Sequence, residues 1–433
     1  MEWNELEEKF VRTYYKNDMY LKLMDAYNDI MCNRSNLTRE QRKEDPSYES
    51  LLLLNERCNM KCTYCFERHN HNKLGNMSNE TLLNSLNFLN ELPNDVTLSL
   101  FGGEPTINIR AFKTLSGWLR ENKLKSIKNC KITTNAYELG DELLGYLSDI
   151  SKHIFLDIVV SLDGTQETHD VARVDSQGNG TYIKILNNIK RLREIVPNAI
   201  VSTQTTLTNY NIDKWKEIVF NCKQLKGISQ FHFINLDDPD MSDDSDTLTK
   251  EQLRPIFEFY YNTICGLEDF YDGTYMNLFE NSICNPFMLR VVSICGAGWK
   301  SFAVRPNGDI LPCHKYIDGR SGQTFILGNV NDDMSKFNIP ERYINLNTKI
   351  LEDGAVHNQD GRDCTMCVLK ENCKGCTASN ELMTGDIMVK SNRVCERTKI
   401  LAELALEYKE PWLDKEIDKL TNIIEGYIQL HND

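Results

Sequence analysis

The sequence LLLLNERCNMKCTYC at residues 51–65 decides the fold, because an apolar run typical of a buried strand ends directly in a group of cysteines. The three thiols belong to Cys58, Cys62 and Cys65, which lie on one short loop. Three thiolates can hold an iron-sulfur cube and leave one iron with an open coordination position, whereas a structural zinc site closes with four ligands. Zinc remains the alternative here, with His69 or His71 as its fourth ligand.

Strand-like and helix-like segments alternate around this loop. The predicted strands are Tyr48–Asn55, Val96–Phe101, Lys131–Thr134, Ile154–Leu162, Ala199–Leu207 and Ser229–Leu236. Helical periodicity lies between them, from Ser78, at Ile109–Glu121, at Tyr182–Val196 and at Ile212–Leu225. Regular alternation implies parallel strands with helical crossovers, so we predict an α/β fold, a full or partial (β/α) barrel whose chemistry lies at the C-terminal strand ends.

Composition and charge narrow the class of protein. The 433 residues are 41% hydrophobic and 26% charged, which excludes a disordered or fibrous chain. A formal net charge of −14 gives no reason to expect a nucleic acid as partner. No apolar run approaches the roughly 20 residues of a membrane span, and residues 1–25 lack the basic and apolar segments of a secretory signal. We therefore expect a cytoplasmic protein that binds no membrane.

Cysteine is the unusual residue, with 15 in the chain. The cytoplasm keeps thiols reduced and a chain of this size needs no disulfide staples, so metal ligation is the better explanation. Besides the three on the first loop, a second group comprises Cys295, Cys313, Cys364, Cys367, Cys373, Cys376 and Cys395. The scattered cysteines are interpreted as small buried side chains, and they are Cys32, Cys130, Cys222, Cys265 and Cys284.

The CX3CX2C spacing, with Tyr64 just before the third cysteine, resembles the signature of the radical S-adenosylmethionine (SAM) superfamily. Gly102-Gly103-Glu104-Pro105 after the second strand is similar to the GGE motif of that superfamily. Further similar positions are Thr134-Asn135, Ser161 to Gly164, and the HDxxR segment from His169 to Arg173. The resemblance implies a partial (β/α)6 TIM-like barrel whose SAM-contacting residues are Tyr64, Gly102, Gly103, Glu104, Pro105, Asn135, Ser161, Asp163 and Arg173.

The resemblance also implies the chemistry. Cys58, Cys62 and Cys65 would hold a 4Fe-4S cluster whose open iron binds the amino and carboxylate groups of SAM. Reductive cleavage of SAM would give a 5′-deoxyadenosyl radical that removes a hydrogen atom from the substrate. This requires a reducing partner such as a flavodoxin or ferredoxin. No acid–base constellation is needed, and we assign no catalytic residue.

The second group of cysteines resembles the SPASM extension of radical enzymes that modify peptides and proteins, including the segments RPNGDILPC at 305–313 and ILGNV at 326–330. Paired CxxC knuckles alone would favour a zinc ribbon in a non-enzymatic adaptor. The resemblance implies an outer auxiliary cluster and an inner one, which gives three 4Fe-4S clusters in the chain. The outer ligands would be Cys364, Cys367, Cys373 and Cys395, and the inner ligands Cys295, Cys313 and Cys376. One spacing departs from the family, with two residues instead of three before Cys376.

Three inner ligands leave one iron open. Where the anaerobic sulfatase-maturing branch has a further cysteine this chain has Ser301, and where that branch has its catalytic aspartate it has His314. The hypothesis is therefore a maturase that links a substrate cysteine sulfur to a carbon, as in sactipeptides and ranthipeptides. In a first alternative, Cys284 or a non-cysteine ligand closes the cluster, and the enzyme forms a carbon–carbon crosslink or carries out another peptide oxidation. The second alternative is sulfatase-type maturation.

The resemblance and the composition together divide the chain. We expect an N-terminal helical cap at 1–47, the barrel at 48–236, an acidic linker and bridging helix at 237–284, the SPASM domain at 285–396 and C-terminal helices at 397–433. The linker, with DDPDMSDDSD at 237–246, is interpreted as a solvated segment. The short helical N-terminal region predicts no full leader-recognition module. The expected partners are a Cys-containing precursor peptide and a separate leader-binding protein.

Overall fold

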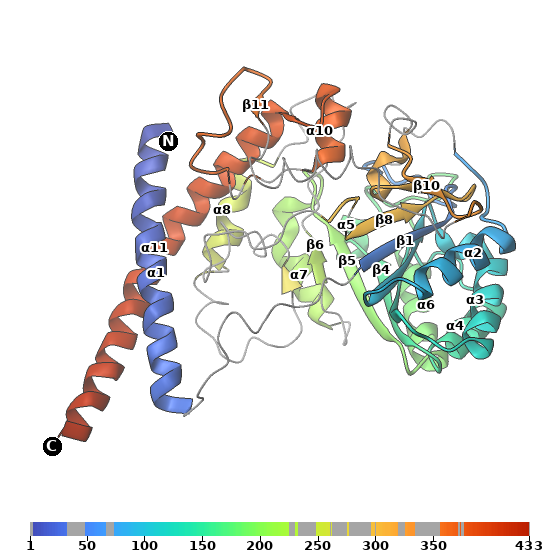
Figure 1. Ribbon diagram of the computed structural model, residues 1–433, viewed down its shortest axis with the longest axis horizontal. Helices are drawn as coiled ribbons and strands as arrows, with labels where there is room; N and C mark the ends of the chain where they lie inside the picture. The colour runs from blue at the N-terminus through green and yellow to red at the C-terminus, as the bar shows by residue number, and fades with distance from the viewer. Residues whose placement is uncertain are drawn as a thin grey trace.

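The computed structural model is built around one sheet and a pair of long helices from the two ends of the chain (Figure 1). It describes residues 3–32, 48–65, 73–224, 230–232, 248–259, 261, 275–276, 296–298, 300–318, 325–333, 356–370, 373 and 376–432. The acidic stretch 237–246, both histidines of the zinc alternative, Cys284 and Cys295 lie outside these residues.

Six parallel strands follow one another across the sheet in sequence order. They are β1 (Tyr48–Asn55), β2 (Val96–Gly102), β3 (Ile127–Thr134), β4 (Phe155–Ser161), β5 (Ile200–Thr206) and β6 (Gln230–His232). This confirms the predicted α/β partial barrel. The third strand begins four residues earlier than Lys131, because Ile127 and Cys130 are buried in it despite the polar residues between them.

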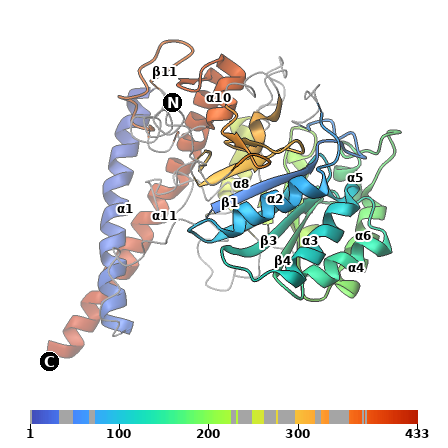
Figure 2. The ribbon, with the colours of Figure 1, turned by 45° about the vertical axis from the view of Figure 1, so that its right-hand side comes forward.

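Helices cover the outer face of the sheet, as Figure 2 shows. They are α2 (Asn79–Asn90), α3 (Ile109–Glu121), α4 (Asp141–Ile150), α6 (Tyr182–Ile195) and α7 (Trp215–Gln224). Ser78 caps α2 by accepting a hydrogen bond from the Thr81 backbone N–H, which explains why that helix begins where the sequence predicts. The helix α4 was not predicted, since its ten residues include Gly145 and give only a short apolar pattern.

Strands from the C-terminal region extend the same sheet. β8 (Ser301–Val304) pairs in parallel with β1, and β9 (Asp309–Leu311) and β10 (Gly328–Asn329) continue antiparallel from it. β7 (Tyr275–Met276) adds to the other edge beside β6. The sequence predicts the C-terminal strands only as short elements of a second domain. Their pairing with β1 follows from its buried LLLL run, which leaves no solvent-facing side and needs a neighbour on each edge.

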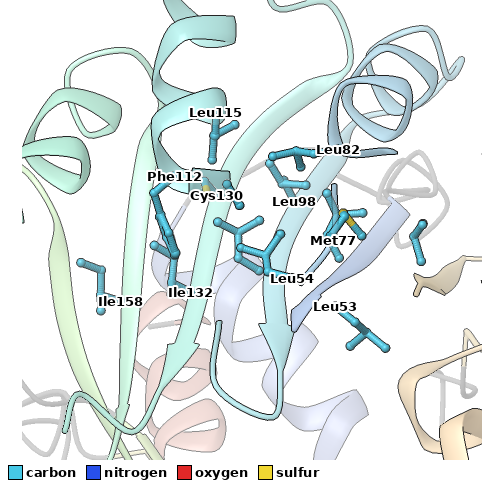
Figure 3. Packing of buried hydrophobic residues seen from close by; sticks show 14 of the residues in the cluster. Leu53, Leu54, Met77, Leu82, Leu98, Phe112, Leu115, Cys130, Ile132 and Ile158 are labelled. Atoms are coloured by element: carbon cyan, nitrogen blue, oxygen red, sulfur yellow. The ribbon is translucent and has the colours of Figure 1, made fainter. Parts of the chain in front are cut away.

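The main core lies between the sheet and its helices. Figure 3 shows Leu54 and Leu98 from the strands, Phe112 and Leu115 from α3, and Ile132 from β3 in contact across this layer. All five side chains are buried. Burial of such side chains contributes roughly 1.5–3 kcal/mol each, and this layer therefore fixes the positions of the strand ends.

A second core joins the two ends of the chain. The helices α1 (Trp3–Cys32), α8 (Lys250–Phe259) and α11 (Asn392–Asn432) bury Leu6, Phe257 and Leu404 together. α1 and α11 lie side by side (Figures 1 and 2), and an ion pair between Arg12 and Glu410 joins them. No helix in the described ranges combines the length and apolar character needed to cross a membrane.

The remaining elements are short and lie mainly at strand ends and in the C-terminal region. They are η3 (Pro105–Ile107), α5 (Gln166–His169), η4 (Ile212–Lys214), η8 (His314–Asp318), β11 (His357–Asn358), α10 (Thr377–Thr384) and β12 (Val389–Lys390).

Candidate functional site

The cysteine loop lies between the other strand-end loops. On one side, the Gly103 N–H donates to the Asn55 carbonyl at 2.7 Å and the Glu104 N–H to the Arg57 carbonyl at 2.9 Å. On the other side, the backbone N–H groups of Lys61 and Thr63 donate to the carbonyls of Val174 and Ala172. The loop carrying Cys58, Cys62 and Cys65 is therefore held by backbone hydrogen bonds from segments that follow β2 and β4.

Glu104 joins the ends of β2 and β3. Its buried carboxylate accepts hydrogen bonds from the N–H and hydroxyl of Thr106, from the Thr134 hydroxyl at 2.7 Å and from the Asn135 N–H at 2.7 Å. Burial raises the pKa of Glu104, and these donors oppose the rise. Oε2 accepts only the Asn135 bond among these, so it retains a lone pair for a further donor such as an ammonium group.

Asn135 reaches the first cysteine. Its side-chain Nδ2 lies 3.6 Å from Cys58 Sγ and donates to Asn59 Oδ1 at 2.8 Å. The Asn59 Nδ2 atom is buried and has no hydrogen-bond partner within the described residues. Burial and the Glu104 carboxylate raise the pKa of Cys58 to about 12. The Asn59 amide could donate to a carboxylate, and the neighbouring Cys58 thiolate could bind iron. The two residues therefore fit a cluster that holds a ligand with a carboxylate group.

Tyr64, Asp163 and Arg173 form one buried network beside Cys62. The Tyr64 hydroxyl donates to Asp163 Oδ2 at 2.5 Å, and Arg173 Nε donates to the same oxygen at 2.8 Å. Asp163 Oδ1 accepts the Thr206 N–H at 2.9 Å. The Arg173 Nη1 atom lies 4.0 Å from Cys62 Sγ. Arg173 therefore directs its charge at an aspartate and a cysteine of the loop, and its predicted contact with SAM stays a prediction.

The other predicted positions lie at the same edge of the sheet. Ser161 is the last residue of β4 and pairs with Gln204, and Pro105 begins η3. His169 accepts the Asp163 N–H on Nδ1 at 3.1 Å, and burial lowers its pKa to about 4. Sequence reasoning missed Asn59, Thr106 and Thr206. Their only signal is a polar side chain next to a strand end, which many structural residues share.

The two glycines of GGEP serve close backbone packing. Gly102 has φ +132°, and a Cβ there would lie 2.1 Å from the Asn55 carbonyl oxygen. At Gly103 the corresponding distance to the Arg57 carbonyl oxygen is 2.6 Å. The absence of side chains at these two positions therefore allows the backbone before Cys58 to approach the GGEP turn.

We expect Gly102→Ala to lower the free energy of unfolding by on the order of 3 kcal/mol, because it adds both backbone strain and a clash with main chain. Urea denaturation measures the change. Gly117→Ala in α3 is the control, since nothing lies within 4 Å of its added Cβ, and it should stabilise by about 0.5–1 kcal/mol. Equal midpoints for the two variants would contradict the packing role.

The four predicted outer ligands surround one cavity. Cys364, Cys367, Cys373 and Cys395 line it together with Trp3, Arg362, Leu369, Lys370, Lys390 and Thr398. Burial, and next the charge of Cys373, raise the pKa of Cys364 to about 11, as expected for thiols that face one another. Among the described residues, no three His, Cys, Asp or Glu side chains are placed to hold a single metal ion. Four cysteines that line one cavity fit a group held by four thiolates, such as a 4Fe-4S cluster.

Described residues next to the predicted inner ligands in the sequence make several hydrogen bonds. The Ser301 N–H donates to the Gly296 carbonyl at 2.7 Å, and the Gly298 N–H donates to the Pro312 carbonyl at 3.0 Å. Gly296 follows Cys295 in the sequence and Pro312 precedes Cys313. Ser301 ends the turn that starts at Gly296, and it is the first residue of β8. The Tyr316 hydroxyl donates to Thr377 Oγ1 at 3.0 Å, and Thr377 directly follows Cys376, the N-cap residue of α10.

Comparison with known proteins gives the class. Residues 52–221 match the profile of the Radical SAM superfamily, and the chain is a radical SAM enzyme. Residues 295–377 match the iron-sulfur cluster-binding SPASM domain, which places the chain among the radical SAM enzymes that carry this extension. SAM and 4Fe-4S clusters, including auxiliary clusters in the SPASM domain, are its cofactors. The thiol groups, the buried Asn59 amide and the free lone pair of Glu104 fit them.

Several relatives are similar over most of the chain. The cysteine-type anaerobic sulfatase-maturating enzyme of Clostridium perfringens is 26% identical over 80% of this chain and 93% of its own. The subtilosin biosynthesis protein AlbA of Bacillus subtilis is 26% identical over 66% of this chain and 58% of its own.

Solved structures show the same fold. The structure of anSMEcpe with bound AdoMet and the Cp18Cys peptide superposes with a TM-score of 0.65 at 22% identity, covering 87% of this chain and 99% of that one. SuiB of Streptococcus suis bound to its precursor peptide SuiA gives 0.57 at 19% identity, covering 81% and 76%.

Proposed function

We propose that this enzyme forms a thioether between a cysteine sulfur and a carbon of a ribosomally made precursor peptide. The observation that carries the proposal is Ser301. It occupies the turn that joins the neighbours of Cys295 and Cys313, where a fourth cysteine would close the inner cluster. A hydroxyl is a poor ligand for iron in such a cluster, so the position is left to the thiolate of the substrate.

When bound, the cofactors would supply hydrogen-atom abstraction, with one-electron cleavage of SAM giving methionine and 5′-deoxyadenosine, the latter containing one substrate hydrogen. Formation of the carbon–sulfur bond would release the thiol proton to solvent and leave one electron, which a bound iron-sulfur cluster would accept. The peptide therefore loses two hydrogens for each thioether, and the enzyme consumes no further oxidant.

The residues of this chain orient the reacting groups. Cys58, Cys62 and Cys65 would hold the SAM cluster, with Asn135 beside the first thiol and Arg173 beside the second. The outer four cysteines would hold a closed cluster for electron transfer. The ring centroids of His314 and Phe101 lie 5.1 Å apart. The residue after Cys313 therefore lies beside β2, the strand that ends at GGEP. The substrate peptide would lie between these two sites.

The relatives support a peptide substrate. SuiB has been solved with its precursor peptide SuiA, and AlbA takes part in the biosynthesis of the bacteriocin subtilosin. The anSMEcpe structure likewise contains a bound peptide, Cp18Cys. We further propose a flavodoxin or ferredoxin as electron donor and a separate leader-binding protein.

The product tests the proposal. We expect a short Cys-rich reading frame near the gene of this enzyme, and a synthetic peptide of that sequence is incubated anaerobically with enzyme, SAM and reductant. We expect a mass loss of two hydrogens per crosslink and the loss of one alkylatable thiol each time. The control peptide carries serine in place of cysteine and should stay unmodified. A peptide that loses two hydrogens but keeps its thiols would contradict the thioether and favour a carbon–carbon link.

Sulfatase-type maturation is the second candidate, because the Clostridium perfringens enzyme matches over 93% of its length. His314 and Ser301 stand where that branch is expected to carry an aspartate and a cysteine. High-resolution mass spectrometry separates the candidates, since the thioether keeps the sulfur in the product. A sulfatase-derived peptide that is converted with loss of sulfur would establish the second candidate instead.

A further inference from the structure

A buried ion pair connects the C-terminal domain to the cysteine loop. Glu56 is completely buried two residues before Cys58. Its Oε1 accepts Arg305 Nε at 2.7 Å and its Oε2 accepts Arg305 Nη2 at 2.8 Å. Arg305 directly follows β8 in the RPNGD turn, 249 residues along the chain, within the region that matches the SPASM domain. This two-pronged geometry fixes both position and orientation of the carboxylate.

The same carboxylate closes the base of the cysteine loop. Glu56 Oε2 also accepts the backbone N–H of Leu74 at 2.9 Å, where the chain returns from the loop. Next to it, Asn55 Nδ2 donates to Asn76 Oδ1 at 2.7 Å. The chain segments before and after the loop are therefore joined through the Glu56 side chain, and Arg305, from the C-terminal region, holds that side chain in place.

Glu56 also lies between the two carbonyls that receive GGEP. Asn55 and Arg57 accept the N–H groups of Gly103 and Glu104. A rotation of Glu56 would turn both of these peptide units. The turn that carries Glu104 and the loop that carries Cys58 would then shift relative to each other, because Gly102 and Gly103 pack directly against the backbone of Asn55 and Arg57.

We infer that Arg305 is a positioning residue for the SAM site: the SPASM domain, through this side chain, sets the geometry of the cysteine loop relative to GGEP. Arg305 has this role only if Cys58, Cys62 and Cys65 hold the SAM cluster, as proposed above. A buried ion pair contributes little net stability compared with apolar residues of the same volume, so the structural need alone does not explain it. The two hydrogen bonds from Arg305 fix the orientation of the Glu56 carboxylate, which an apolar pair could not do.

The double variant Glu56→Leu/Arg305→Met separates position from stability. It removes the pair without leaving a buried charge, but the Leu74 N–H loses its acceptor, so the urea midpoint should fall by no more than the loss of one buried hydrogen bond causes. We expect at least tenfold weaker SAM binding, measured by equilibrium dialysis. We also expect a broadened electron paramagnetic resonance spectrum of the reduced SAM cluster after SAM is added. Wild-type affinity and spectrum in this variant would overturn the inference.

Two further variants keep the test decisive. Arg305→Lys retains the charge but cannot make the bidentate contact, so SAM binding should weaken about threefold to tenfold. If the double variant does not fold, wild-type SAM affinity in Arg305→Lys overturns the inference. Asn307→Ala alters the same turn, where Asn307 contacts Asp309 and not Glu56, and should leave SAM binding unchanged. Equal weakening in Asn307→Ala would also overturn it.

Failure of this inference is distinguishable from failure of the proposed function. No peptide enters the experiment, so it is independent of thioether formation. The variant that lacks Cys58, Cys62 and Cys65 serves as the reference for the cluster assignment. If that variant still shows the SAM-dependent change in its spectrum, the cysteine assignment fails and the role of Arg305 falls with it.

Discussion

Replacement of Cys58, Cys62 and Cys65 by alanine is expected to remove about four irons per chain and to abolish reductive cleavage of SAM. The three thiols lie on one loop held by backbone hydrogen bonds from GGEP and from residues 172–174. No other cysteine in the described part of the chain lies on this loop. Iron analysis and chromatographic detection of 5′-deoxyadenosine measure the two losses.

Cys130→Ala is the matched control. Cys130 is buried in the main core, and burial raises the pKa of its thiol to about 12, so it stays an uncharged apolar side chain. This variant should keep its full iron content and its SAM cleavage. Detectable 5′-deoxyadenosine from the triple variant would contradict the assignment of the first loop.

Arg173→Met is expected to lower the free energy of unfolding by about 3–5 kcal/mol, because it leaves the carboxylate of Asp163 buried without its cation. Asp163 has no exposed surface, and among the described residues only the Tyr64 hydroxyl and the Thr206 N–H would still donate to its carboxylate. Urea denaturation under anaerobic conditions measures the loss. The loop should also become disordered around Cys62, which reduces iron incorporation.

Lys214→Met provides the comparison for this ion pair. Lys214 bonds Glu167 at 2.7 Å, but both side chains are largely exposed, so the pair is screened by solvent. We expect no measurable change in its urea midpoint. If Arg173→Met unfolds at the same urea concentration as Lys214→Met, the buried ion pair with Arg173 does not stabilise the Asp163 carboxylate.

The sequence was sufficient to predict those elements in which a motif directly follows a clear hydrophobic pattern. The strand before Cys58 was predicted at Tyr48–Asn55 and lies there, because four consecutive leucines between polar boundaries admit one short buried strand. The strand-end motifs were placed at one edge for the same reason, since parallel strands bring their C-terminal ends together.

Long-range pairing was not accessible from the sequence. The parallel pairing of β8 with β1 and the contact of Arg305 with Glu56 join residues about 250 positions apart, and no local pattern encodes them. The RPNGD segment predicts a turn but not its partner. Glu104 shows the same limit, because its motif suggested an acceptor for a ligand and its four internal donors emerge only from the fold.

The two auxiliary sites differ in how far they are defined. The four cysteines that the resemblance implies as outer ligands line one cavity, and their role as ligands stays a prediction. For the inner cysteines the structure gives only hydrogen bonds of neighbouring residues, because Cys295 lies outside the described residues, and their common role as ligands stays a prediction. Ser301 is the position on which the proposed chemistry depends. A Ser301→Cys variant should close the inner cluster and prevent binding of a substrate thiol.

The most direct measurement uses a variant lacking Cys58, Cys62 and Cys65, so that only auxiliary clusters contribute to the electron paramagnetic resonance spectrum. We predict that N-acetylcysteine amide changes the spectrum of the reduced inner cluster and that N-acetylserine amide does not. Adding Ser301→Cys should abolish the response. A spectrum that stays unchanged at saturating N-acetylcysteine amide, or that changes equally in the Ser301→Cys background, would contradict an open iron that receives the sulfur of the substrate.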